Sequence, residues 1–183
     1  MHAIAITSNH QTETASQNLL QVIGGALFIA LTAQIKIPLF FTPVPLVLYS
    51  LTILLVGGML GKKKGTLSVL LFLTMAACGL PVLGGWRSEP GIFFGPLGGY
   101  FIGFFIQSYL IGWLMEKTQA KSITYICAST IGTTVLQLSI GACWLGAFIG
   151  WEQGWLLGFL PFLISDTLKA LIGAAVLKTT HAN

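Results

Sequence analysis

Charged residues are almost absent from long stretches of this chain, and that scarcity constrains the fold more than any other feature. Only 8% of the 183 residues are charged, whereas 55% are hydrophobic. A soluble domain has about 25% charged residues, because charged side chains make up much of its surface. The composition excludes a disordered chain and a polar scaffold, argues against an ordinary cytosolic enzyme, and indicates a protein that mostly faces lipid.

The apolar stretches are long enough for six membrane-spanning helices. A helix needs about 20 apolar residues to cross a bilayer, so six spans use roughly 120 residues and leave no room for a second, soluble domain. We therefore predict an all-α integral membrane protein: a six-helix domain over residues 18–178, between an N-terminal tail (1–17) and a C-terminal tail (179–183). The predicted spans cover residues 18–35, 45–60, 65–80, 97–115, 122–148 and 155–177.

The basic residues predict the orientation in the membrane, since Lys and Arg gather on the cytoplasmic side. Six spans with a cytoplasmic N-terminus leave only Lys36 and Arg87 outside, and both termini are then cytoplasmic in a cell-membrane protein. The Pro-, Gly- and aromatic-rich connections at 36–44 and 82–96 face outward with a turn at 150–154, which suggests a ligand entrance there. The bases expected inside are Lys62, Lys63, Lys64, Lys117, Lys121 and Lys178.

The sequence offers no groups for catalysis or metal binding. Its three histidines lie in the tails, its three cysteines share no metal-ligand spacing, and no Ser–His or Cys–His pair is suitably placed. No phosphate-binding G-x-x-x-x-G-K-[ST] loop is present, so this chain cannot itself hydrolyse ATP to drive transport. We predict no enzyme activity, catalytic residues, metal or cofactor, and we assign the net charge of +4 to membrane topology rather than to nucleic-acid binding.

Asp166 and Lys169 are the strongest candidates for binding residues. They lie in the middle of the last apolar stretch, where an isolated charge costs about 2.5–3.5 kcal/mol on insertion scales. Their i, i+3 spacing places both on one helical face, where they can touch. The pair either locks helix packing by mutual neutralisation or forms the polar floor of a ligand pocket with amide-like and carboxylate groups to recognise.

Weaker candidates lie in the outer loop and on the first span. Arg87 either makes an exposed pair with Glu89 or binds a ligand carboxylate, for which a guanidinium is well suited. Trp86 and Tyr100 are candidates for ligand contact or for an interfacial aromatic belt. Ala26 and Ala30 form a small-xxx-small pair that allows a second helix to approach closely.

Several motifs together resemble the BioY family, the biotin-specific substrate-binding (S) subunits of energy-coupling-factor (ECF) transporters. The similar segments are ALTAQIKIPLFFTPVPLVLYSLTILLVGGMLG (30–61), LFLTMAACGLPVLGG (71–85), GPLGGYFIGF (95–104) and the late Asp166-x-x-Lys169. The similarity extends from about residue 20 to residue 178. TPVPL, GLPV, GP-x-GGY and D-x-x-K are specific in combination, although none of them is specific alone.

This resemblance implies biotin uptake through a six-helix membrane subunit that binds its ligand near the outer face. Asp166 and Lys169 match residues that hydrogen-bond biotin, and the loop with Phe41 and Thr42 matches a lid over the pocket. The partners it implies are a transmembrane coupling protein, docked on the Ala26–Ala30 face, and two ABC-type ATPases. A subunit for another vitamin, such as thiamine or riboflavin, remains the alternative within this class, and a small channel or membrane enzyme the alternative outside it.

Overall fold

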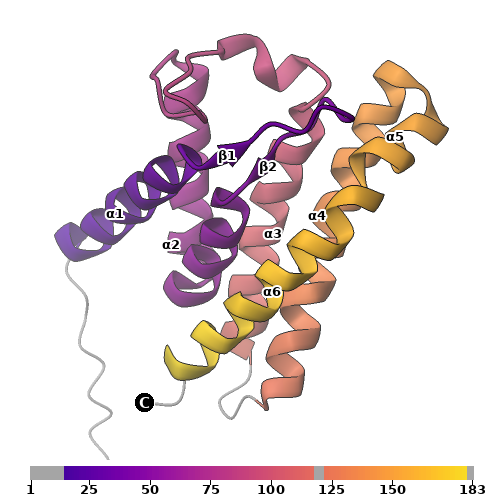
Figure 1. The fold of residues 1–183 in the computed structure, drawn as a ribbon. Coiled ribbons are helices and arrows are strands. Elements are labelled where there is room, and N and C mark those ends of the chain that lie inside the picture. The colour runs from indigo at the N-terminus through magenta and orange to yellow at the C-terminus, as the bar shows by residue number, and fades with distance from the viewer. Residues whose placement is uncertain (1–14, 118–121, 181–183) are drawn as a thin grey trace, which may run out of the picture.

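The computed structural model describes residues 15–117 and 122–180, which form a bundle of helices with one short β-ribbon at one end (Figure 1). Among these described residues, four helical stretches are long and apolar enough to cross a membrane: Ala15–Ala33, Gly98–Lys117, Ile123–Ile149 and Trp151–Thr180. The elements are α1 (Ala15–Ala33), β1 (Lys36–Ile37), β2 (Leu46–Val47), α2 (Tyr49–Ala77), the 3-10 helix η1 (Pro90–Phe94), α3 (Gly98–Lys117), α4 (Ile123–Ile149), α5 (Trp151–Gly158) and α6 (Leu160–Thr180).

Helix α2 is a hairpin of two helical arms that reverses at Gly61. Gly61 has φ 80° and ψ 174°, outside the helical region. A Cβ on Gly65 would lie 2.7 Å from the Cα of Gly57, whereas eight residues of a straight helix span about 12 Å. The arms 49–60 and 62–77 therefore pack against each other, and they correspond to the predicted spans 45–60 and 65–80.

A carboxylate from α3 holds the reversal in place. The backbone N–H of Lys62 donates to Glu116 Oε1 over 2.8 Å, and Lys62 Nζ lies 3.2 Å from Glu116 Oε2. The first N–H groups of a helix have no partner within it, so an acceptor at this point satisfies one of them. Glu116 thus links the end of α3 to the beginning of the second arm of α2.

We expect Gly61→Ala to lower the thermal stability of the purified protein. A side chain at this φ and ψ costs about 1–3 kcal/mol in backbone strain, and the new Cβ would lie 2.5 Å from Glu116 Oε1. Thermal unfolding in detergent measures the change. Gly24→Ala is the matched control because a Cβ there meets nothing within 4 Å. Equal melting temperatures for the two variants would contradict the proposed role of Gly61.

The structure contradicts two predictions for this region: the turn at 150–154, and a last span that runs without a break over 155–177. Only Gly150 leaves the helical path, with φ 96°, and α5 begins at the next residue. The real break comes at Phe159, just before Pro161, which has no N–H to donate to the carbonyl of Leu157. Phe162 N donates to the oxygen of Phe159 instead of that of Gly158. Two carbonyls at the end of α5 are therefore available to other partners.

The connection after α1 forms a β-ribbon that the all-helical prediction did not include. Lys36 pairs with Val47 and Ile37 with Leu46 in antiparallel register, which closes the 38–45 loop. The ribbon crosses the end of the bundle from α1 toward α5 (Figure 1). Three prolines in this segment cannot donate backbone hydrogen bonds, which is consistent with so short a ladder.

Candidate functional site

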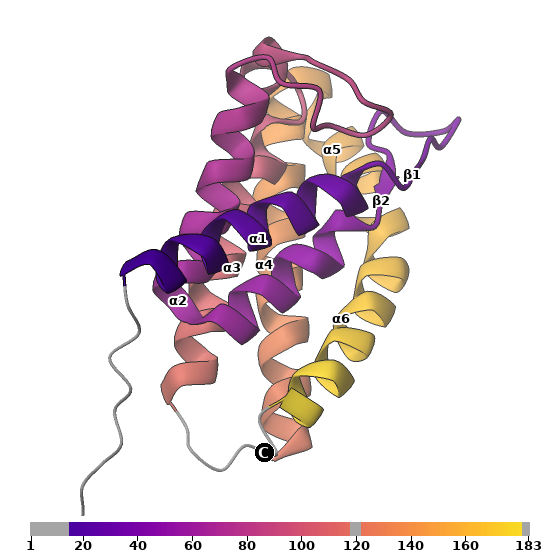
Figure 2. The same ribbon diagram turned by 90° about the vertical axis from the view of Figure 1, so that its left-hand side faces the viewer.

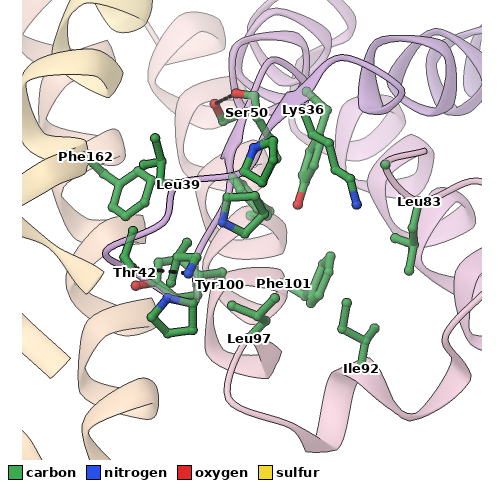
Figure 3. A pocket seen from close by; sticks show the side chains of 18 of the residues that line it. Lys36, Leu39, Thr42, Ser50, Leu83, Ile92, Leu97, Tyr100, Phe101 and Phe162 are labelled. Carbon is green, nitrogen blue, oxygen red and sulfur yellow. Dashed lines mark hydrogen bonds between the residues drawn. The ribbon is translucent and has the colours of Figure 1, made fainter. Parts of the chain in front are cut away.

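A cavity of about 440 Å³ lies beneath the β1–β2 ribbon, at the end of the bundle (Figure 3). Its walls come from the ribbon, the loop before η1, α3 and α6, and its volume suits a small organic ligand. Apolar side chains form most of the wall, and a few polar groups lie at its floor and mouth. The main apolar residues are Leu39, Leu83, Ile92, Leu97, Phe101 and Phe162.

The floor of the cavity is an ion pair held by the beginning of α2. Lys169 Nζ contacts Asp166 Oδ1, and it also donates to Ser50 Oγ over 2.8 Å and to the Val47 carbonyl over 2.9 Å. Ser50 Oγ in turn lies 3.3 Å from Asp166 Oδ1, to which it donates. Asp166 is only 6% exposed. Such a buried pair is stable only where further hydrogen bonds complete it, as the Ser50 and Val47 contacts do.

The contacts give the two charged groups different roles toward a ligand. An ammonium group has three N–H donors, and the Asp166, Ser50 and Val47 contacts use all three. Both contacts to Asp166 involve Oδ1, which leaves Oδ2 as the oxygen that can accept from a ligand. Asp166 is thus suited to bind a donor group directly, while Lys169 positions it.

The two carbonyls at the end of α5 are bound by side chains that line the cavity. Thr42 Oγ1, from the ribbon loop, donates to the Leu157 carbonyl over 2.7 Å. Tyr100 Oη, from α3, donates to the Gly158 carbonyl over 2.7 Å. The break before Pro161 therefore provides two neighbouring carbonyls at the end of α5. The ribbon loop binds one of them and α3 binds the other.

The mouth of the cavity carries two cationic side chains, Arg87 and Lys36. Arg87 Nη1 lies 3.2 Å from Glu89 Oε1, and both side chains are well exposed. Lys36 lies on β1 (Figure 3), and its side chain lies close to Gly84 and Gly85. Two cations with one acid leave the mouth net positive.

Five of the seven predicted ligand-contact residues line the cavity among the residues that the structure describes: Asp166, Lys169, Arg87, Tyr100 and Thr42. Phe41 and Trp86 do not line it. Phe41 is 46% exposed and packs edge-on against Phe40, and Trp86 is 66% exposed. Each is the loop neighbour of a lining residue, Thr42 or Arg87, and each is itself exposed.

The predicted docking face on α1 is also not a free surface. Ala26 is fully buried, and Ala30 packs against the same hydrophobic core. The small side chains let α1 lie close to the rest of this chain, so they serve internal packing. The exposed face of α1 consists of larger apolar residues: Leu20, Ile23, Leu27, Phe28 and Leu31.

Sequence reasoning missed Ser50 and Lys36 as parts of the site. Ser50 is one of many hydroxyl residues near a helix end, and only the fold brings it to Asp166. Lys36 stands out in the sequence only as a base outside the apolar stretches, which indicates membrane orientation. Neither Ser50 nor Lys36 follows from this, but the sequence does contain a signal for another contact of the site. Pro161 cannot donate to the carbonyl of Leu157, four residues earlier, so that carbonyl needs another donor, which is Thr42.

Comparison with known proteins places this constellation in a family. The BioY family model matches residues 7–183. The chain belongs to the BioY family. A probable biotin transporter BioY from Pyrococcus horikoshii is 35% identical over 161 residues, which cover 86% of this chain and 94% of that protein. Biotin transporter BioY from Thermotoga maritima is 32% identical, over 85% of this chain and 92% of that protein.

The BioY assignment extends to the three-dimensional fold. A crystal structure of the S-component for biotin from an ECF-type ABC transporter matches with a TM-score of 0.83 at 29% identity. The match covers 93% of this chain and 95% of the solved chain. The cavity and its Asp166–Lys169 floor therefore lie in a fold like that of the solved S-component.

Proposed function

We propose that this chain captures biotin as the substrate-binding subunit of an ECF-type transporter. The observation that carries the proposal is the buried Asp166–Lys169–Ser50 floor of a ligand-sized cavity in a BioY family chain. Charged residues are rare and energetically costly inside membrane segments. A buried charged pair there is therefore a candidate for recognising a polar group of a ligand. The proposed binding of biotin is non-covalent.

The chemistry of the cavity matches the two ends of biotin. Its ureido ring carries two N–H donors, and Asp166 Oδ2 is the acceptor available at the floor. The apolar wall suits the sulfur-containing ring and the alkyl chain. The carboxylate at the end of that chain then reaches the mouth, where Arg87 and Lys36 supply positive charge. We infer that biotin binds with its ureido ring inward.

Membrane orientation is the second part of the proposal. The two arms of α2 act as separate membrane segments. Together with the four longer stretches they make six segments. Both termini then lie on the cytoplasmic side of the cell membrane. The charge distribution supports this, because the reversal within α2 and the C-terminal end of α6 lie at the opposite end of the bundle from β1 and the loop before η1 (Figure 1). The first two segments carry Lys62–Lys64 and Lys178, and the last two carry Lys36 and Arg87. The cavity then opens outward.

Partner proteins supply the energy in this proposal. The chain has no phosphate-binding loop for ATP. Accumulation of biotin against a gradient therefore requires a transmembrane coupling protein with two ABC-type ATPases, as in the transporter class of the structural relative. Capture of biotin by this subunit requires none of them.

Calorimetric titration of the detergent-purified protein tests the proposed function. We expect one saturable biotin site without ATP, and we expect thiamine and riboflavin neither to compete nor to bind. A biotin-induced rise in melting temperature should accompany binding, because a ligand of the folded state stabilises it. No heat and no stabilisation with biotin would refute the proposal, and competition by thiamine or riboflavin would assign the site to another vitamin.

We expect Arg87→Gln to weaken biotin binding about fivefold while leaving biotinamide binding unchanged. The exposed guanidinium contributes a modest, charge-dependent term to carboxylate binding. Biotinamide lacks that carboxylate, so it serves as the matched ligand control in the same titration. Equal losses for the two ligands would show that Arg87 acts on loop structure and not on the carboxylate.

A further inference from the structure

The Gln34 side chain connects the end of α1 to the loop that carries Arg87. Gln34 directly follows α1, and its Oε1 accepts from the backbone N–H of Trp86 over 2.8 Å. Its Nε2 donates to the Val82 carbonyl over 3.3 Å and to a carbonyl of α1 itself over 2.9 Å. We call residues 82–87 the Arg87 loop. One amide, with both N–H donors and its oxygen in use, thus fastens this loop to α1.

The Arg87 loop is a tight turn whose backbone needs a restraint from outside. Leu83 N donates to the Arg87 carbonyl over 3.3 Å, and Arg87 N donates to the Leu83 carbonyl over 3.2 Å. Trp86 lies within this turn and has φ 58°, in the left-handed region that residues with a Cβ rarely adopt. Such a backbone persists only where surrounding contacts determine it. The Trp86 side chain is exposed, so the contact of Gln34 with its N–H supplies this restraint.

The Arg87 loop lies directly against the end of α1. A Cβ on Gly84 would lie 3.1 Å from the Ala33 carbonyl and 2.5 Å from Lys36 Cδ, so only glycine allows the loop to come so close. Figure 2 shows α1 leading into the β1–β2 ribbon at the end of the bundle where this loop also lies. The end of α1 therefore determines the positions of two segments at the cavity mouth: the ribbon with Lys36, and the Arg87 loop.

The Arg87 guanidinium has little of its own to hold it at the mouth. In its ion pair with Glu89 the two side chains are 62% and 46% exposed, and such surface pairs contribute little to structure. The place of the guanidinium therefore depends on the backbone of the Arg87 loop, and that backbone depends on Gln34.

We propose that Gln34 is a positioning residue for biotin binding: it holds the Arg87 loop so that the guanidinium meets the carboxylate of the ligand. The inference rests on the proposed function, since it requires that carboxylate at the mouth. Gln34 is not among the described residues that line the cavity, so its effect reaches the ligand through Arg87. A ligand without the carboxylate should then be insensitive to Gln34.

Hydrogen–deuterium exchange of the ligand-free, detergent-purified protein tests the contact itself. The variants are Gln34→Met, which keeps the chain length without the amide, and Gln34→Ala, which removes the side chain. Thr32→Val is the matched control, because Thr32 Oγ1 donates to the Phe28 and Ile29 carbonyls within its own helix. We expect a peptide covering the Arg87 loop to exchange roughly tenfold faster in both Gln34 variants and at the parent rate in the control. Parent-like exchange in both Gln34 variants would overturn the proposal.

Calorimetric titration with biotin and biotinamide tests the role toward the ligand. We expect Gln34→Met to weaken biotin binding about fivefold, like Arg87→Gln, and to leave biotinamide binding within about twofold of the parent. In the Arg87→Gln background Gln34→Met should cause no further loss, because residues that act through one contact are not additive. Thr32→Val should bind both ligands like the parent.

Two results of the titration would overturn the positioning role. Equal losses for biotin and biotinamide, or a second full loss in the Arg87→Gln background, would make Gln34 a structural residue of the loop. Biotinamide affinity verifies the fold of each variant, and Gln34→Ala repeats the test if Gln34→Met does not fold. A parent protein that binds no biotin would refute the proposed function, and this inference with it, whatever the exchange rates.

Discussion

Asp166→Asn is expected to weaken biotin binding about 10- to 100-fold, since a hydrogen bond to a charged group contributes about 1.5–3 kcal/mol. The variant keeps the size of the side chain but removes its charge and places an N–H₂ group among donors. Lys169 retains Ser50 and the Val47 carbonyl as partners, so we expect the protein to remain folded. Calorimetric titration with biotin measures the loss.

The alternative role for Asp166 is to hold the helices together without touching the ligand. In that case Asp166→Asn would lower the melting temperature but leave the biotin-induced rise intact. If Asp166 binds the ligand, we expect Asp166→Asn to lose most of the biotin-induced rise in melting temperature. Glu152→Gln, the same change of carboxylate to amide at an exposed site on α5, is the matched control and should behave like the parent. Parent-like biotin affinity of Asp166→Asn would make the pair structural.

Thr42→Val should increase the rate of biotin dissociation about tenfold. The valine has nearly the same shape but cannot donate to the Leu157 carbonyl, which has lost its helical donor because of Pro161. Leaving a buried acceptor without a partner costs about 1–3 kcal/mol, and here that cost falls on the closed position of the ribbon loop. Stopped-flow displacement of a fluorescent biotin measures the rate.

Thr42→Ser is the control for this prediction, because it keeps the hydroxyl and removes only a methyl group. We expect its dissociation rate to stay within about twofold of the parent rate, since the donor to Leu157 is retained. An equal acceleration in both variants would attribute the effect to packing of the methyl group. Parent-like dissociation from Thr42→Val would show that the Thr42–Leu157 hydrogen bond does not hold the loop over the cavity.

Local sequence patterns were sufficient to predict those features that lie within a single helix. Apolar length predicted the helices over 97–115 and 122–148 to within a few residues of α3 and α4. The i, i+3 spacing predicted the contact between Asp166 and Lys169, because both lie on a single helix. The predicted spans 45–60 and 65–80 leave a break between them, and the chain does reverse there, at Gly61.

The rest of the site depends on contacts between segments far apart in the chain. Ser50 reaches Asp166 across 116 positions, and Thr42 reaches Leu157 across 115. No periodicity in the sequence encodes such pairs. In the loops, Phe41 and Trp86 could not be distinguished from Thr42 and Arg87, because an irregular backbone has no fixed alternation of side-chain direction. The turn predicted at 150–154 failed for a related reason, since Gly150 alone ends α4.

A crystal structure of the protein with biotin bound is the decisive test of the proposed binding site. We predict biotin beneath the β1–β2 ribbon, with a ureido nitrogen within hydrogen-bond distance of Asp166 Oδ2. The carboxylate should lie at the mouth, near Arg87 and Lys36. Biotin outside this cavity, or bound in the reverse orientation with its carboxylate at Lys169, would contradict the proposed binding mode.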